Sequence, residues 1–452
     1  MGLALPAVRL NIAELARNIG GSVFVDGARA QAPDGAVVGA TQDSRSVEPG
    51  QLFVPLIVER NGHDFIEGAI AAGAGAYLTS EPPGPGLAIA VHDTMEALSA
   101  AGRYARSLVA GPVVGITGSV GKTSAKDLLA GALAATRPTH ASTKSFNNEI
   151  GVPLTLLNTP DDAEAVVLEM GARGIGHIAT LCEVASPTVG IVTTVAGAHM
   201  GEFGSIENIA IAKGELVESL PDTGLAVLNA GNPYIAGMAS RTRANVLTFG
   251  LADDVEQTAP SVVVNRIELD DELRATFTID SDWGEVVARP QMRGAHMAGN
   301  VAAAVGAALW LGSSIADVEA GIADAAVSPW RMEVFRSAGG ALIINDSYNA
   351  NPTSMMGAID SLARVAEPRK IAVVGYMGEL GPDEAKEHQA IASALSHRGI
   401  EMIAVGTDLY GSDPRENPLD VEAELAALDE TSAVLIKGSR SAGLEKLAEV
   451  LR

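Results

Sequence analysis

Short apolar runs alternate with alanine-rich stretches in the first part of the chain. Gln51–Leu56 has the pattern of a short strand, and Asp64–Ala72 has the composition of a helix. Gly111 ends this pattern, and a new strand-like apolar run follows at Val113–Thr117. We therefore predict a small α/β domain over residues 1–110.

A longer stretch then repeats an apolar run followed by a helical run. Three of its apolar runs have the composition of buried parallel strands: Ala165–Glu169, Val189–Thr194 and Ala226–Asn229. Between residues 261 and 287 valine, isoleucine and threonine alternate with polar residues, which predicts antiparallel strands. An alanine-rich helix is predicted at Ala298–Leu311. These patterns predict a central domain over residues 111–328 with a mostly parallel sheet.

After Pro329 and Trp330 strands and helices alternate again. The predicted strands are Leu342–Asn345, Ile371–Gly375, Met402–Gly406 and Val434–Lys437. This alternation predicts a Rossmann-like, doubly wound domain over residues 329–452. The predicted fold class is therefore α/β, in three domains.

The charge of the chain excludes one class of partner. Asp plus Glu total 55 and Lys plus Arg total 31, giving a net charge of −24, so the protein repels a polyanion and nucleic acid is not an expected partner. The lone Cys182 cannot form an internal disulfide, which favours a reducing compartment. No run reaches the roughly 18 apolar residues of a membrane span, and the first residues lack a signal peptide's layout. We expect a cytoplasmic protein and a monomer.

The clearest chemical signal lies between the predicted strand at Val113–Thr117 and the helical run Ala125–Ala135. This segment reads Gly115-Ile116-Thr117-Gly118-Ser119-Val120-Gly121-Lys122-Thr123-Ser124. Glycines let backbone N–H groups converge on phosphate oxygens, the next helix presents its N-terminus, Lys122 can reach terminal phosphates and Thr123 can bind magnesium. The strict pattern has glycine where Ile116 stands, so the loop is a shortened Gly-x-x-Gly-Lys-Thr. It predicts a P-loop-type domain that binds a nucleotide.

A P-loop enzyme also needs a carboxylate for its metal ion, often at the end of a neighbouring strand. Glu169 ends the predicted strand Ala165–Glu169. Taken alone, such a carboxylate is more often a loop cap or part of an ion pair. Beside a P-loop it becomes a magnesium candidate.

Several separate segments, in order along the chain, resemble those of the Mur ligases. They are Asp43-Ser44-Arg45, Gly62 to Phe65, Lys144 to Pro153, Glu169-Met170-Gly171, Ala198-His199-Met200, Ala212-Lys213-Gly214-Glu215, Asp346 to Pro352 and Lys437-Gly438-Ser439-Arg440. The segment from Asp346 to Pro352 resembles the motif of the family member that adds D-alanyl-D-alanine. Two positions depart from the family pattern: Leu56 to Asn61 lacks an expected Lys-Gly pair, and Thr194 stands where asparagine is common.

The resemblance implies an ATP-dependent amide-bond ligase that joins D-alanyl-D-alanine to UDP-N-acetylmuramoyl-tripeptide in peptidoglycan precursor synthesis. The implied ATP site comprises Gly118, Ser119, Val120, Gly121, Lys122, Thr123, Ser124, His296, Asn300, Arg331, Asp346 and Asn349. The implied ligands of magnesium, expected as two ions, are Thr123, Glu169, His199 and Lys213. The implied substrate residues are Asp43, Ser44, Arg45, Asn147, Asn148, Glu149, Asn351, Lys437, Ser439 and Arg440. The implied catalytic residues are Lys122, Lys213 and His199.

By the same resemblance Lys213 is expected to carry a carbamate. An ammonium near magnesium would repel the metal, whereas a carbamate offers anionic oxygen, the ligand that magnesium prefers. Carbamate formation needs the neutral amine, so Lys213 should be buried with a lowered pKa. A lysine on a helical run would otherwise simply be solvated.

Other hypotheses stay open at this stage. The chain could be the diaminopimelate- or lysine-adding Mur ligase, a folate polyglutamate ligase, or a nucleotide-dependent switch. Asp43-Ser44-Arg45 argues against the folate enzyme, and Asn349 to Pro352 argues against the other Mur ligases. Without the resemblance, His199 could be a ligand, a helix cap or a core histidine, and Asn147 to Glu149 could be a turn before a helix.

Overall fold

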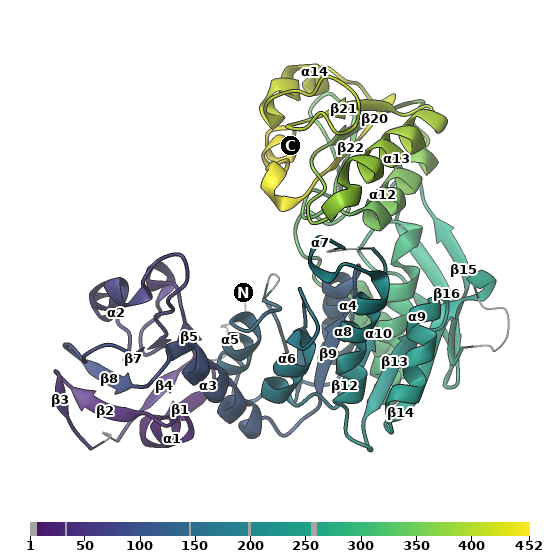
Figure 1. The fold of residues 1–452 in the computed structure, drawn as a ribbon. Helices are drawn as coiled ribbons and strands as arrows, with labels where there is room; N and C mark the ends of the chain where they lie inside the picture. Colours follow the sequence, from purple (N-terminus) through teal and green to yellow (C-terminus); the bar gives the residue numbers. More distant parts are fainter. Residues whose placement is uncertain (1–6, 32–33, 144–145, 198–199, 255–259) are drawn as a thin grey trace.

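The structure, a computed structural model, describes residues 7–31, 34–143, 146–197, 200–254 and 260–452. Three α/β parts follow one another along the chain, as Figure 1 shows. The N-terminal part, in purple, and the C-terminal part, in yellow-green, lie on different sides of the teal middle part. This confirms the predicted α/β fold class.

The N-terminal domain is built on a six-stranded sheet in the order β3-β2-β8-β7-β6-β5. Strands β5 to β8 run parallel, and β8, β2 and β3 pair antiparallel. The strands of this domain are β1 (Arg9–Asn11), β2 (Ser22–Val25), β3 (Ala28–Arg29), β4 (Ala36–Val38), β5 (Ala40–Thr41), β6 (Leu52–Phe53), β7 (Ala76–Thr79) and β8 (Leu87–Ala90). Its helices are α1 (Ile12–Asn18), α2 (Ile66–Ala71) and α3 (Thr94–Leu108).

The middle domain contains a nine-stranded sheet in the order β10-β11-β9-β12-β13-β14-β15-β16-β17. Its strands are β9 (Val113–Thr117), β10 (Thr139–Ala141), β11 (Ala165–Glu169), β12 (Val189–Val192), β13 (Leu225–Asn229), β14 (Asn245–Leu251), β15 (Val262–Leu269), β16 (Ala275–Ser281) and β17 (Gly284–Ala288). The sheet is parallel from β10 to β15 and antiparallel from β15 to β17. The predicted antiparallel strands are therefore present, and they extend the parallel sheet.

Helices cover both faces of this sheet. They are α4 (Lys122–Ala134), α5 (Gly151–Leu157), α6 (His177–Ala185), α7 (Met200–Phe203), α8 (Ile206–Glu218), α9 (Pro233–Ala236), α10 (Ala298–Trp310) and α11 (Ile315–Asp324). Neighbouring residues of β9 point to opposite faces: Val113 joins the core under α5, α6 and α8, and Val114 joins the core under α4, α10 and α11. Burial on both faces explains why these strands are continuously apolar.

The C-terminal domain has a five-stranded sheet in the order β18-β19-β22-β20-β21. Its strands are β18 (Glu333–Arg336), β19 (Leu342–Asn345), β20 (Arg369–Val374), β21 (Glu401–Ala404) and β22 (Ser432–Lys437), and its helices are α12 (Pro352–Arg364), α13 (Glu384–His397), α14 (Glu422–Ala426) and α15 (Glu445–Val450). Strand β18 is antiparallel to its neighbour and the other pairs are parallel. Two separate apolar cores lie on the two faces, as expected for a doubly wound sheet.

Polar contacts tie the N-terminal domain to the middle domain. The side-chain amide of Asn158 donates to the Ala40 carbonyl at 2.8 Å and accepts from the Ala40 N–H at 3.2 Å. The Val8 N–H donates to the Thr159 carbonyl at 2.7 Å. The predicted domain boundaries at 110/111 and 328/329 stay predictions. None of the helices formed by the described residues is long and apolar enough to cross a membrane.

Candidate active site

The phosphate loop connects β9 directly to α4. Gly121 is the N-cap of α4 and has φ 88°, a left-handed conformation that glycine adopts without strain. A side chain there would also collide with Asn300, whose Oδ1 lies 2.3 Å from the position of an added Cβ. The helix begins at Lys122, three residues before the predicted start. The backbone N–H groups of its first turn are therefore directed to the loop, which suits phosphate oxygens.

Two lysines lie at this loop, Lys122 half-buried and Lys213 buried. Lys122 Nζ donates a 2.7 Å hydrogen bond to the Gly118 carbonyl, and desolvation lowers its pKa. Burial of Lys213, on α8, together with the charge of Lys122 brings the pKa of Lys213 well below the usual value. The expectation of a buried Lys213 with a lowered pKa is confirmed. A lysine in this state is partly available as the neutral amine.

A short series of side-chain hydrogen bonds connects the phosphate loop to the end of β11 and to the C-terminal domain. The Thr123 hydroxyl donates to Glu169 Oε2 at 2.7 Å, and Asn147 Nδ2 donates to Glu169 Oε1 at 2.8 Å. Arg331 Nη2 donates to Thr123 Oγ1 at 2.8 Å. The predicted residues Thr123, Glu169, Asn147 and Arg331 are thus in direct contact although they are far apart in sequence.

The donor set at Thr123 and Glu169 fits magnesium. One hydroxyl and one carboxylate oxygen are hard ligands, and Mg²⁺ typically takes one or two protein oxygens and completes its shell with water and phosphate. In the part of the chain that the structure describes, no group of three or more His, Cys, Asp or Glu side chains could hold a metal by itself. His199, the other predicted ligand, lies outside the described residues.

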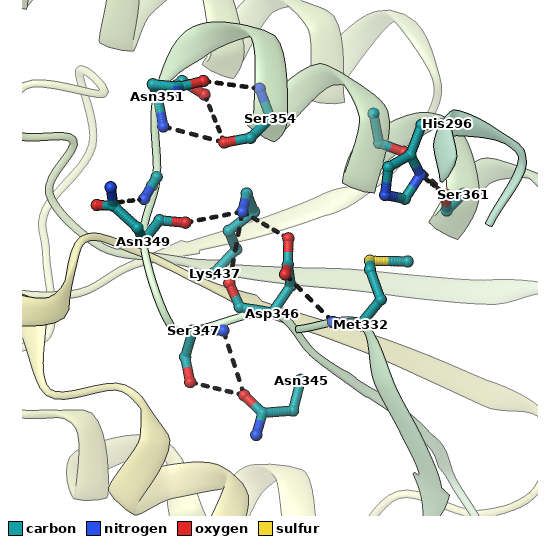
Figure 2. A network of polar contacts seen from close by, with 12 residues as sticks. His296, Met332, Asn345, Asp346, Ser347, Asn349, Asn351, Ser354, Ser361 and Lys437 are labelled. Atoms are coloured by element: carbon teal, nitrogen blue, oxygen red, sulfur yellow. Dashed lines mark hydrogen bonds and ion pairs between the residues drawn. The ribbon is translucent and has the colours of Figure 1, made fainter. Parts of the chain in front are cut away.

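On the C-terminal side a second polar cluster is centred on Lys437, as Figure 2 shows. The Lys437 ammonium, buried at the end of β22, bonds to Asp346 Oδ2 at 2.5 Å and to the Asn349 carbonyl at 2.9 Å. Asn351 caps α12 through reciprocal bonds with Ser354. These contacts hold the segment from Asp346 to Asn351 against the end of the sheet.

His296 and Asn300 lie in two consecutive elements. His296 lies in a short 3₁₀ turn, η5 (Ala295–Met297), before α10, whereas Asn300 is within α10. His296 is packed beside Gly357 and Ser361 of α12, and burial lowers its pKa. Asn300 is packed against Gly121. Both side chains line the same cavity, His296 beside α12 and Asn300 beside the phosphate loop.

A cavity of about 1190 Å³ lies between the middle and C-terminal domains. The predicted site residues on its wall are Ser119, Val120, Gly121, Lys122, Thr123, Ser124, Asn147, Asn148, Glu149, Glu169, Lys213, His296, Asn300, Arg331, Asp346, Asn349, Asn351, Lys437, Ser439 and Arg440. Asp43, Ser44 and Arg45 are not on this wall. They lie in the N-terminal domain, where Arg45 donates to both Asp43 oxygens at 2.8 and 2.7 Å and lowers the pKa of that carboxyl to about 2.

The sequence analysis missed several cavity residues, among them Arg173, His177, Tyr376 and Glu379. Arg173 lies in the glycine-rich loop that follows the buried strand β11, and His177 begins α6 at the end of that loop, which is a signal that could have identified them. Glu379 follows β20 in a similar loop and has φ 66°, unusual for a residue other than glycine.

Comparison with known proteins agrees with this geometry. Residues 116–308 match the Mur ligase middle domain, and residues 330–451 match the domain described as Mur ligase, glutamate ligase domain. The chain is 36% identical to the UDP-N-acetylmuramoyl-tripeptide--D-alanyl-D-alanine ligase of Mycobacterium tuberculosis, over 98% of each chain.

Two solved structures are similar along nearly their whole length. One is the UDP-N-acetylmuramoylalanyl-D-glutamyl-2,6-diaminopimelate--D-alanyl-D-alanyl ligase from Acinetobacter baumannii, 27% identical over 99% of each chain with a TM-score of 0.86. The other is the MurF ligase from Thermotoga maritima in complex with ADP, 27% identical over 91% of this chain and 96% of that chain, with a TM-score of 0.78. The motifs, the fold and these similarities agree, and this chain belongs to the Mur ligase family.

Proposed function

We propose that this chain is an ATP-dependent ligase that joins D-alanyl-D-alanine to UDP-N-acetylmuramoyl-tripeptide in the synthesis of the peptidoglycan precursor. One observation carries the proposal. A single cavity has the phosphate loop on one wall and the segment Asp346 to Asn351 on the other, in a chain 36% identical over 98% of its length to a ligase of that name.

ATP would bind with its phosphates at the loop from Gly118 to Ser124. Lys122 and the first N–H groups of α4 supply positive charge there, and Arg331 approaches from the C-terminal domain. The related Thermotoga maritima enzyme is described in complex with ADP, which supports an adenine nucleotide as a ligand. His296 and Asn300, beside the loop, are proposed to contact the base.

The reaction has two steps. The tripeptide carboxylate attacks the γ-phosphorus of ATP, ADP leaves, and an acyl phosphate forms. The amine of D-alanyl-D-alanine then attacks the acyl carbon, and phosphate leaves as the amide bond forms. Because the first step brings two anions together, the task of Lys122 and Arg331 is mainly to neutralise and align them.

Two magnesium ions are part of the proposal. Thr123 and Glu169 would hold one, and His199 together with a carbamate on Lys213 would hold the other. Magnesium there would supply positive charge against the phosphates. The burial of Lys213 and its lowered pKa support the carbamate, because carbon dioxide reacts with the neutral amine.

The first domain is proposed to bind the uridine nucleotide through Asp43, Ser44 and Arg45, outside the cavity. The sugar peptide would extend from there along the middle domain to the phosphate loop, where Asn147, Asn148 and Glu149 would contact it. Asn351, Lys437, Ser439 and Arg440 would contact the peptide substrates from the C-terminal domain. Closure of that domain would keep water from the acyl phosphate. We propose a monomer that works in the cytoplasm.

The test is phosphate release measured with each substrate omitted in turn. Release is expected only when ATP, UDP-N-acetylmuramoyl-tripeptide and D-alanyl-D-alanine are all present, with the amide product identified by mass. Phosphate release that continues at the same rate without the UDP-sugar peptide would instead indicate a nucleotide-hydrolysing switch.

A further inference from the structure

Arg173 is held less tightly than three other basic side chains of the cavity. Lys122, Arg331 and Lys437 each donate a hydrogen bond of 2.5 to 2.8 Å to a partner at the site. Arg173 instead makes a long ion pair, 3.9 Å, with Glu202. Both side chains are open to solvent, with exposed fractions of 74% and 38%. An exposed ion pair of this kind contributes little, so Arg173 loses little when a ligand carboxylate replaces this contact.

The loop that carries Arg173 is firmly held by its backbone. The buried carboxylate of Glu215, on α8, accepts from the Gly176 N–H at 2.5 Å and from the Ala179 N–H at 2.9 Å. At the other end of the loop the Gly171 N–H donates to the Asn147 carbonyl at 2.7 Å. The position of Arg173 on the cavity wall is thus fixed at the backbone, although its side chain is exposed.

Arg173 also lies close to the place where the tripeptide must react. It follows Glu169 by four residues, so their Cα atoms are at most about 14 Å apart, and Glu169 contacts Thr123 of the phosphate loop. The carboxylate that reacts belongs to the third residue of the tripeptide. The side chain of that same residue must therefore lie in this neighbourhood.

The two candidates for the third residue differ in charge at the end of the side chain. Lysine ends in an ammonium group alone. Diaminopimelate ends in a carbon that bears both an ammonium and a carboxylate, which is a zwitterion. In a chain of net charge −24 an added substrate carboxylate needs a local cation.

We propose that Arg173 and Glu202 recognise the side-chain end of diaminopimelate, with Arg173 binding its carboxylate and Glu202 its ammonium. Arg173 is then the residue that makes the enzyme prefer diaminopimelate to lysine, because a lysine side chain would place an ammonium beside the guanidinium and leave it without an anion. This proposal rests on the proposed function and specifies its peptide substrate.

The test compares two forms of UDP-N-acetylmuramoyl-tripeptide, with meso-diaminopimelate or L-lysine at the third position. The wild-type enzyme should have a higher kcat/KM for the diaminopimelate form by on the order of ten- to a hundredfold, the usual range for a charge-assisted hydrogen bond. Arg173→Ala should remove most of this preference by raising KM for the diaminopimelate form. Its kcat, its KM for ATP and its kcat/KM for the lysine form should change little. Arg173→Lys, which keeps the charge, should restore part of the preference.

Arg243→Ala is the matched control, because Arg243 is an exposed arginine in an ion pair with Asp222 and lies away from the cavity. It should leave the preference unchanged. The proposal is wrong if the wild type uses both peptides equally well, or if Arg173→Ala weakens both to the same extent. An absence of amide product with either peptide would instead contradict the proposed function itself.

Discussion

Lys122 and Lys213 come from different helices but both line the cavity, where desolvation lowers the pKa of each. Two ammonium groups in one desolvated site repel each other, so each favours the neutral form of the other. An anion between them removes this repulsion. The pair is therefore suited to a site that is completed by phosphate on one side and by a carbamate on the other.

The first prediction is the effect of removing the Lys122 side chain from the phosphate loop. Lys122→Ala should lower kcat by at least about a hundredfold, since removing one preorganised donor from developing charge costs that much in comparable sites. The melting temperature should remain close to that of the wild type, because the loop is shaped by its backbone and by Gly121. Steady-state kinetics with thermal unfolding checks this. A kcat within about tenfold of the wild type would contradict the role assigned to the phosphate loop.

The second concerns Lys213. Lys213→Ala should be nearly inactive, and short carboxylates such as acetate should restore part of its activity, because they can supply the missing anionic oxygen to magnesium. Lys213→Ala assayed with matched concentrations of chloride serves as the control. Electron density in crystals grown with bicarbonate should show an extended, branched Lys213 side chain. Near-normal activity of the variant, or an unmodified lysine in the liganded enzyme, would rule out the carbamate.

Many of the cavity residues could be predicted because they belong to contiguous motifs. In the segments around Lys122, Asp346 and Lys437, the functional side chains lie within a few residues of one another in the sequence. Arg173 and Glu379 belong to none of these motifs; their only signal is a place in a loop after a buried strand, and which of these loops reach the cavity depends on the fold. The same limit applies to the packing of His296 on α12, a contact between residues 65 positions apart.

Among the elements of the C-terminal domain, the loop after β20 is held by His388 and by Ser439. The His388 ring, buried on α13, accepts from the Met377 N–H through Nε2 at 2.9 Å and donates through Nδ1 to the Glu384 carbonyl at 2.7 Å. The Gly378 N–H donates to Ser439 Oγ at 2.8 Å. These bonds require a neutral His388, and burial lowers its pKa accordingly.

This arrangement predicts a pH dependence of stability. Because the pKa of His388 is lower in the folded state, the unfolded chain takes up the proton first as the pH falls below about 6.5, and stability is lost. His388→Gln keeps an acceptor but does not titrate. The melting temperature of the wild type, relative to that of this variant, should therefore fall when the pH is lowered from 7.5 to 5.5.

The control is His397→Gln, on the exposed last turn of the same helix. It should show a smaller change over that pH range. A wild-type advantage that stays constant or grows on acidification would contradict the role of a neutral His388.

Element types were predictable where periodicity was strong, as in the strands β9, β11 and β19. The start of α4 was placed too late because Lys122 and Thr123 form helix while they also belong to the loop. Boundaries of this kind depend on backbone geometry at Gly121, which a hydrophobic pattern does not encode.

In the whole molecule, the middle and C-terminal domains approach each other backbone to backbone at one point. Gly201, in α7, and Gly381, in the 3₁₀ turn η6 (Gly381–Asp383), lie so close that a Cβ on Gly381 would be 2.8 Å from the Gly201 Cα. The Gly201 N–H also donates to the Glu379 carbonyl at 3.4 Å. Because both sides of this contact are backbone atoms, a change of side-chain rotamer could not relieve a clash there.

Gly381→Ala should therefore separate these elements and lower kcat/KM for ATP by about tenfold, equivalent to about 1.4 kcal/mol. Gly399→Ala is the matched control, because Gly399 has φ 64° against 63° for Gly381 but no atom within 4 Å of an added Cβ. Both variants carry the same backbone strain, so both should lose some thermal stability. Equal kinetic effects of the two substitutions would show that the interdomain contact has no role in nucleotide use.

Arg331 would couple magnesium binding at Thr123 to the position of the C-terminal domain. Its guanidinium, from the C-terminal side, occupies a lone pair of Thr123 Oγ1, the oxygen proposed to bind magnesium. Magnesium bound to this oxygen would stand beside the guanidinium, and the two positive charges would repel each other. By thermodynamic linkage, whatever holds the C-terminal domain in this position would weaken magnesium binding by the same factor by which magnesium weakens that hold. The affinity for the proposed magnesium ion would thus also measure how the domains are arranged.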